Sequence, residues 1–189
     1  IAEAIGGKQT RGNGYITLDN GDVVSWCYGH ILRLAEPEEY DEKYKKWRMA
    51  DLPMLPETLP TKVISKTKKQ FTIVKKLINA PDTERLICAT DAGREGELIF
   101  YYIYQQAKCK KPVDRLWISS MTDEAIREGF AQLKPDSEYE GLRKSAVCRS
   151  EADWLVGMNA SRAFTLRYDV LLSVGRVQTP TLAILVKRR

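Results

Sequence analysis

Apolar and polar positions recur along the chain with periods that predict both helices and strands. Between residues 67 and 78 the apolar side chains stand near 3.6 residues apart with lysines between them, which predicts an amphipathic helix. A largely apolar run over residues 85–90 predicts a strand covered on both faces. A helical pattern over 98–107, a β-like run over 113–120 and a helical pattern over 122–133 follow it. This alternation predicts an α/β fold, in which helices flank a parallel sheet.

The segments around this α/β pattern differ in character. The Asn20–Gly21 pair separates two β-rich runs and predicts a hairpin. Residues 35–62 hold four prolines among many charges, which predicts a long irregular segment on the surface. Residues 139–165 lack β signals and favour a helix, and Pro180 favours the start of another. The first residues resemble the end of a helix stopped by glycines, so we expect a strand and most of a helix to precede them.

Composition narrows the class of protein. With 189 residues, 43% of them hydrophobic, the chain is long enough to form one substantial core. No apolar run approaches the roughly 20 residues that cross a bilayer, and no signal peptide is visible. The four cysteines form no CxxC pair, which argues against structural zinc, and we expect Cys88 and Cys148 to be small buried hydrophobes of a cytoplasmic protein. The formal charge of +5 suits an anionic partner.

The residues most informative about chemistry run from Asp91 to Glu97, because they follow a predicted parallel strand at its carboxyl end, where open α/β sheets bind ligands. Asp91 and Glu95 offer hard oxygen ligands to Mg²⁺, and Arg94 offers a guanidinium to a phosphate oxygen. A second interpretation has about equal weight on these seven residues alone. Acidic side chains at the start of a helix also complement the helix dipole without binding any ligand.

The sequence Asp91-Ala-Gly-Arg-Glu-Gly-Glu97 closely resembles the acidic motif of the Toprim domain in bacterial type IA DNA topoisomerases of the topoisomerase III kind. Further stretches resemble this family in the expected order, namely Tyr28-Gly-His-Ile with residues 35–41 and Trp47 behind it, residues 115–126, and residues 153–162 together with 173–181. The resemblance spans nearly the whole chain. It implies a Toprim domain over residues 1–143, with its first strand missing, and the start of a helical DNA-binding domain over residues 144–189.

The resemblance also implies a mechanism. One DNA strand passes through a transient break in another, a 5′-phosphotyrosine preserves the bond energy so that no ATP is needed, and Mg²⁺ lies at the Toprim carboxylates. Asp91 and Glu95 match the first and third acidic positions of the family's Asp-x-Asp-x-Glu pattern, whereas Gly93 takes the middle one and removes a candidate ligand. The family's Glu-Lys-Pro-Ser segment and its active tyrosine match nothing here. We therefore expect the chain alone to be catalytically inert and to need the remainder of the polypeptide.

The same resemblance assigns candidates for contact with single-stranded DNA. Arg162, Arg176 and Gln178 match positions that line the family's single-strand groove, where a guanidinium holds phosphate and an amide donates to backbone or base. Surface arginines with no such role are common, and the motif favours DNA contact more for Arg176 than for Arg162. His30 falls in the Gly-His-Ile stretch near the Toprim core, and we expect it to be a hydrogen-bonded structural residue, with support of the active site as the alternative role.

Aromatic side chains are candidates for base stacking, but their sequence context favours packing. Trp117 and Trp154 have apolar neighbours, so we expect both in the core. We also expect Tyr28 to pack within a strand.

Two other functional classes remain open at the level of sequence. Another Toprim enzyme, such as a primase or a nuclease, would need no phosphotyrosine, although residues 173–181 argue against it. A non-catalytic module that binds single-stranded DNA would need no metal chemistry. The sequence favours the topoisomerase, an isomerase that depends on Mg²⁺, engages single-stranded DNA and has no membrane partner.

Overall fold

The computed structural model describes residues 1–188, whose internal contacts divide the chain into two compact units. The first unit comprises Ile1–Arg33 and Val63–Ala146, and the second comprises Leu34–Lys62 and the chain from Val147 onward. The chain passes from one unit to the other within β4 (Leu32–Leu34) and again within β5 (Thr61–Val63). These two strands form a two-stranded sheet. No helix within residues 1–188 is long and apolar enough to span a membrane.

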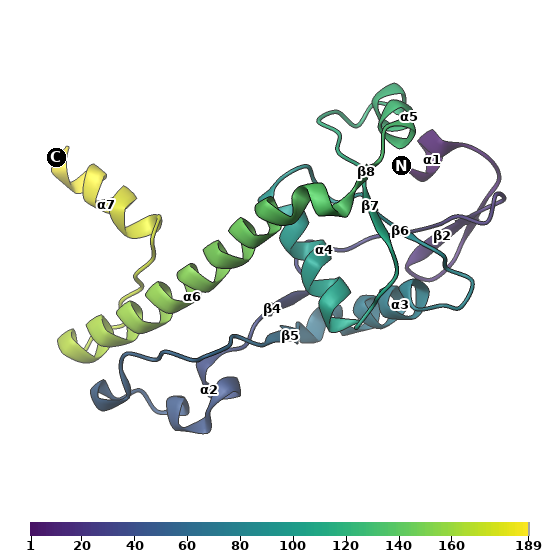
Figure 1. The fold of residues 1–189 in the computed structure, drawn as a ribbon. Coiled ribbons are helices and arrows are strands. Elements are labelled where there is room, and N and C mark those ends of the chain that lie inside the picture. The colour runs from purple at the N-terminus through teal and green to yellow at the C-terminus, as the bar shows by residue number, and fades with distance from the viewer. Residues whose placement is uncertain (189) are drawn as a thin grey trace. The chain divides into compact units, whose positions relative to one another are not determined.

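The first unit begins with a short helix and an antiparallel sheet (Figure 1). Its elements are α1 (Ala2–Ile5), β1 (Gln9–Arg11), β2 (Tyr15–Leu18) and β3 (Val23–Ser25). Gly6 ends α1 at a φ of 88°, in the left-handed region that glycine adopts most readily. Strands β2 and β3 pair antiparallel, with Tyr15 opposite Ser25. The hairpin predicted at Asn20–Gly21 is therefore confirmed.

The α/β part of the first unit follows the predicted alternation. Its elements are η3 (Ser65–Thr67), α3 (Lys68–Ile78), β6 (Leu86–Cys88), α4 (Arg94–Gln106), β7 (Val113–Arg115), α5 (Asp123–Ala131), β8 (Lys134–Pro135) and η4 (Asp136–Tyr139), where η denotes a 3-10 helix. Strands β6 and β7 pair parallel, with Leu86 opposite Val113, while β8 pairs antiparallel with β7. The α/β fold is confirmed, with a sheet that is mixed rather than purely parallel.

Apolar side chains from β6, α4 and α5 fill the core of this unit. Buried members include Leu86, Cys88, Leu98, Ile103 and Ile126. The burial predicted for Cys88 is confirmed, but the same prediction for Cys148 is wrong, because that thiol is exposed on a helix.

Two aromatic predictions in this unit are also wrong. Trp117 is 41% exposed and stacks on Tyr139 with ring centroids 4.9 Å apart, because it follows β7 at the surface. Tyr28 is 67% exposed, because β3 ends at Ser25 and leaves it in a loop.

The second unit packs an irregular segment against part of a long helix. Its elements are α2 (Pro37–Tyr40), η1 (Glu42–Lys45), η2 (Met49–Asp51), the later turns of α6 (Glu140–Tyr168) and α7 (Gln178–Lys187). Tyr44, Met54 and Trp154 form its buried cluster. The Trp154 indole donates to the carbonyl of Ala35 over 2.8 Å, so its predicted core position is confirmed. Residues 35–62 are irregular as expected but not merely superficial, because Met54 is fully buried.

Helix α6 runs without interruption across residues 143 and 144. The domain boundary inferred there from the family resemblance stays a prediction about the complete protein.

Candidate functional site

The acidic motif forms a tight turn between β6 and α4 in the first unit. Helix α4 begins at Arg94, four residues before the helical pattern predicted from Leu98, so Glu95 lies in its first turn. Gly93 caps the helix with a φ of 177°, an extended backbone open to any residue, and a Cβ added there meets no atom within 4 Å. At Gly96 the opposite holds, since an added Cβ would lie 2.0 Å from the carbonyl oxygen of Asp91. Gly96 is thus required by close packing, whereas Gly93 is not.

The two carboxylates predicted as metal ligands are exposed at this turn. Asp91 and Glu95 are both accessible, and Glu95 Oε2 lies 3.1 Å from His30 Nε2. The side chains of His30 and Glu95 are 41% and 62% exposed. His30 therefore lies beside the acidic motif, and a supporting role for it there stays a prediction. Arg94, at the first helical position, is also exposed.

The donor chemistry at the turn fits Mg²⁺ that keeps much of its water. Among residues 1–188, no group of three or more His, Cys, Asp and Glu side chains is close enough to hold a metal ion. Mg²⁺ in phosphate-transfer sites is commonly held by one or two carboxylates together with waters and substrate phosphate. Two exposed carboxylates match that pattern and do not match a closed, all-protein cage. Metal binding by Asp91 and Glu95 stays a prediction.

Glu97, the last acidic residue of the motif, has a different environment from Asp91 and Glu95. Its side chain is fully buried, and Arg115 Nε donates to Glu97 Oε1 over 2.6 Å. This pairing removes Glu97 from the candidate ligands. The sequence analysis did not predict this pair, although a charged residue inside the β-like run over 113–120 was a usable signal.

The DNA-binding candidates of the second unit fall into two environments. Arg162 is 5% exposed, donates from Nη1 to the carbonyl of Tyr44 over 2.7 Å, and lies 3.5 Å from Glu38. Burial lowers the pKa of this guanidinium, and Glu38 opposes that shift. With its guanidinium 5.0 Å from the ring centre of Trp47, Arg162 joins the irregular segment to α6. A DNA contact would require it to leave these partners.

Arg176 and Gln178 are exposed near the start of α7. Arg176 Nε donates to Asp153 Oδ1 over 2.6 Å, and this hydrogen bond raises the pKa of the guanidinium. Gln178 donates to the hydroxyl of Ser173 over 2.8 Å. Both side chains are accessible to a ligand. Arg162, in contrast, is buried in the packing of the second unit.

A wide cleft of the first unit reaches the acidic turn. It has a volume of about 1220 Å³, and its lining includes Val74 and Leu77 of α3, Leu86 and Ile87 of β6, and Asp91. In the order β6-β7-β8, β6 is the edge strand of its sheet within the described residues. The cleft is therefore bordered by a strand edge that is open to further pairing.

Comparison with known proteins gives a consistent set of matches. The family model described as "Toprim domain" matches residues 2–121, and the model described as "DNA topoisomerase" matches residues 137–189. The chain is 53% identical over 178 residues to DNA topoisomerase 3 of Bacillus cereus, covering 94% of the chain and 24% of that protein. It is 52% identical over 178 residues to DNA topoisomerase 3 of Bacillus subtilis, with the same coverage. It is 51% identical over 188 residues to that of Shouchella clausii, covering 100% of the chain and 26% of the relative. The chain thus spans about a quarter of the length of these relatives.

Proposed function

The chain belongs to the Toprim-domain family, and on this premise we propose that it is the metal-binding and strand-engaging part of a bacterial type IA DNA topoisomerase of the topoisomerase III kind. The complete protein would act in the cytoplasm as an ATP-independent isomerase, passing single DNA strands through a 5′-phosphotyrosine break. The observation that carries the proposal is the exposed pair Asp91 and Glu95, held at the carboxyl end of β6 within the span of the Toprim match.

Asp91 and Glu95 would hold Mg²⁺ at this turn, and the ion would supply charge neutralisation and positioning at the scissile phosphate. His30 would orient Glu95 through its hydrogen bond. Arg94, exposed in the first turn of α4, would hold a nearby phosphate oxygen. Gly93 leaves the middle acidic position of the family pattern without a carboxylate, so the remaining ligands would come from water, DNA and segments of the complete protein.

One such segment would be the first strand of the family's Toprim domain. The cleft beside β6 is lined by apolar side chains, borders an open strand edge and reaches Asp91. A strand paired to that edge would fill the cleft and end near the acidic turn. The family's first strand carries a glutamate and a lysine, and this position would bring both beside the metal and the scissile phosphate.

Contact with single-stranded DNA would come from Arg176 and Gln178 in the second unit. Arg176 is exposed and held in place by Asp153, and Gln178 lies two residues farther along the chain. In the parent protein, Arg176→Ala should weaken binding of an oligonucleotide and reduce the slope of log affinity against log salt by about 0.7, because one fewer phosphate is neutralised. Arg85→Ala, which removes another exposed arginine paired with an aspartate, is the control and should leave binding unchanged. Equal binding by wild type and Arg176→Ala would refute the groove assignment.

The experiment that tests the activity uses the complete parent protein, labelled single-stranded DNA and Mg²⁺, quenched with denaturant. A covalent adduct joining a tyrosine to a 5′-phosphate is the expected product. Release of cut DNA without an adduct would favour a Toprim nuclease, and template-dependent synthesis of primers would favour a primase. Tight binding with no cut would favour a non-catalytic DNA-binding module.

A further inference from the structure

We propose that Arg115 is a positioning residue that sets the geometry of the metal-binding turn. The inference rests on the proposed function, because it concerns the same turn, and it assigns a role to a residue that contacts neither metal nor DNA. Arg115 ends β7, and its side chain is fully buried. Few arginines are buried to this extent, and each needs partners for its charge and its donors.

The Arg115 guanidinium fills nearly all of its donor capacity at the turn. Its Nε donates to Glu97 Oε1 over 2.6 Å. Its Nη atoms donate to backbone carbonyls at 2.7 to 2.9 Å, those of Cys88, Thr90, Asp91 and Leu116. The planar guanidinium has five N–H donors in a fixed fork, so it ties the end of β6, the turn and the first turn of α4 to one rigid group.

The bond to Asp91 is the one that bears on metal binding. The Asp91 carbonyl accepts from Arg115 Nη2 over 2.7 Å and from the backbone N–H of Gly93 over 2.9 Å. Gly96 approaches the same oxygen so closely that an added Cβ would lie 2.0 Å away. These contacts fix the backbone of Asp91, and with it the direction in which the exposed carboxylate leaves the chain. Glu95 lies in the first turn of α4, the same turn that Arg115 holds through Glu97.

Stability alone does not account for this arrangement. An apolar pair of similar volume would generally stabilise a core as well as a buried ion pair does. What an apolar pair lacks is the set of donors that hold the carbonyls of Thr90 and Asp91. The hydrogen bonds of Arg115 thus serve geometry, in the way that outer partners of metal ligands orient the ligands themselves.

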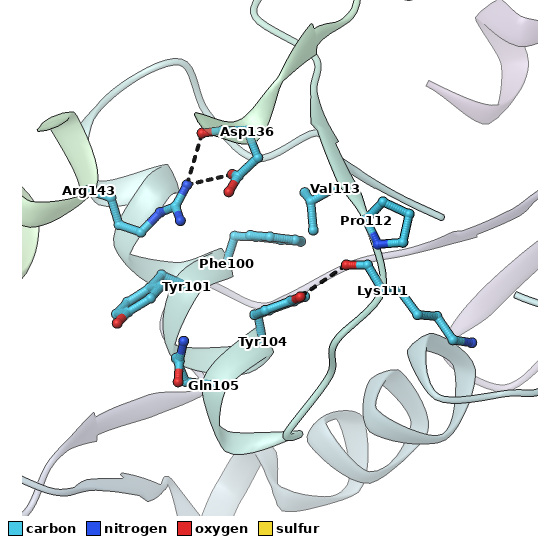
Figure 2. Close-up of a pocket in the computed structure, with 9 residues that line it drawn as sticks. All are labelled: Phe100, Tyr101, Tyr104, Gln105, Lys111, Pro112, Val113, Asp136 and Arg143. Atoms are coloured by element: carbon cyan, nitrogen blue, oxygen red, sulfur yellow. Dashed lines mark hydrogen bonds and ion pairs between the residues drawn. The ribbon is translucent and has the colours of Figure 1, made fainter. Parts of the chain in front are cut away.

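Arg143 offers a matched control because it contacts the other oxygen of Glu97. Its Nε lies 3.8 Å from Glu97 Oε2, and its Nη2 lies 2.6 Å from Asp136 Oδ1. Figure 2 shows its guanidinium directed at Asp136, beside a pocket lined by the aromatic side chains of α4. Arg143 shares the buried carboxylate with Arg115, and its partners here lie away from residues 88–91. A change at Arg143 therefore disturbs the ion-pair network but leaves the hydrogen bonds from Arg115 to the turn intact.

The test uses the complete parent protein and two variants at Arg115. Arg115→Lys keeps a cation beside Glu97 but lacks the fork, and Arg115→Met with Glu97→Leu keeps an apolar core of similar volume without any donor. Affinity for Mn²⁺, measured by electron paramagnetic resonance as a substitute for Mg²⁺, should fall about tenfold in both, the effect typical of losing an outer partner of a metal ligand. The Mg²⁺ concentration that half-maximally supports resealing of cut DNA should rise by about the same factor. Affinity for single-stranded DNA and the far-UV circular dichroism should stay unchanged.

Arg143→Lys should retain the Mn²⁺ affinity of the wild type. Wild-type Mn²⁺ affinity in the variant that combines Arg115→Met with Glu97→Leu would overturn the proposal. An equal loss of Mn²⁺ affinity in Arg143→Lys would also overturn it, because that loss would indicate general loosening of the domain. The two proposals fail separately. A wild-type protein that forms no DNA adduct, but whose Mn²⁺ affinity falls in the Arg115 variants, would refute the topoisomerase function and leave the positioning role intact.

Discussion

Replacing Gly96 by alanine should destabilise the protein, although alanine is normally the better residue inside a helix. Gly to Ala in a helix interior ordinarily stabilises by up to about 1 kcal/mol. Here the added Cβ would lie 2.0 Å from the Asp91 carbonyl oxygen, whereas heavy atoms in good contact are about 3.5 Å apart. The turn would have to shift by about 1.5 Å, at a cost of about 1–3 kcal/mol. The shift would also stretch the 2.7 Å bond from Arg115 to Asp91, worth about 1 kcal/mol.

The net expectation is a loss of about 1–3 kcal/mol in the free energy of unfolding. Gly93→Ser is the control in the same turn, because its Cβ meets open space and serine is a preferred helix cap, so its effect should stay within about 0.5 kcal/mol. Urea unfolding of the parent protein and both variants, followed by far-UV circular dichroism, measures the difference. A Gly96→Ala protein as stable as the wild type, or more stable, would refute the packing of this turn.

Three further predictions concern other parts of the chain. Arg162→Ala should lower the free energy of unfolding by about 1–3 kcal/mol, because it leaves the buried carbonyl of Tyr44 without its 2.7 Å donor, and thermal unfolding measures this. Asp153→Asn should tighten binding of single-stranded DNA several-fold at low salt, because the carboxylate that pairs with Arg176 also repels phosphate; unchanged affinity in fluorescence anisotropy would count against it. Burial, with a smaller contribution from Cys88, raises the pKa of the Cys27 thiol to about 11, so its alkylation at pH 8 should be slow and should accelerate about tenfold per pH unit toward pH 11. The same shift means that the neutral thiol stabilises the fold below about pH 9 and that this contribution is lost as pH rises through 11.

Periodicity and turn chemistry predicted most of the fold. The helices over residues 68–78 and 123–131 and the hairpin at Asn20–Gly21 follow from local patterns, because amphipathic spacing and glycine turns act over a few residues. The exposure of Tyr28 and Trp117 did not follow, because where a strand ends depends on pairing with distant residues. Likewise, residues 35–62 resemble a surface loop by composition, yet Met54 is buried because α6 supplies partners more than a hundred residues away.

The candidate site was predictable to a different extent. The positions of Asp91 and Glu95 at a strand end follow from the sequence, because an apolar run leads directly into the motif. That Glu97 is not a ligand but the buried partner of Arg115 requires the structure, since the pair joins residues 18 apart in sequence. The engagement of Arg162 with Tyr44 is equally invisible in the local pattern.

The most direct test of the proposed function is whether Asp91 and Glu95 hold the metal that the complete protein needs. Resealing of cut DNA by the parent protein would be titrated with Mg²⁺ in the wild type, in Asp91→Asn with Glu95→Gln, and in Asp123→Asn. Asp123 is the control, because it is an exposed acid in the first turn of another helix. We expect the double variant to need at least about tenfold more Mg²⁺, while Asp123→Asn behaves as the wild type. Equal Mg²⁺ requirements in all three proteins would mean that the acidic residues only complement the helix dipole, and the claim would be wrong.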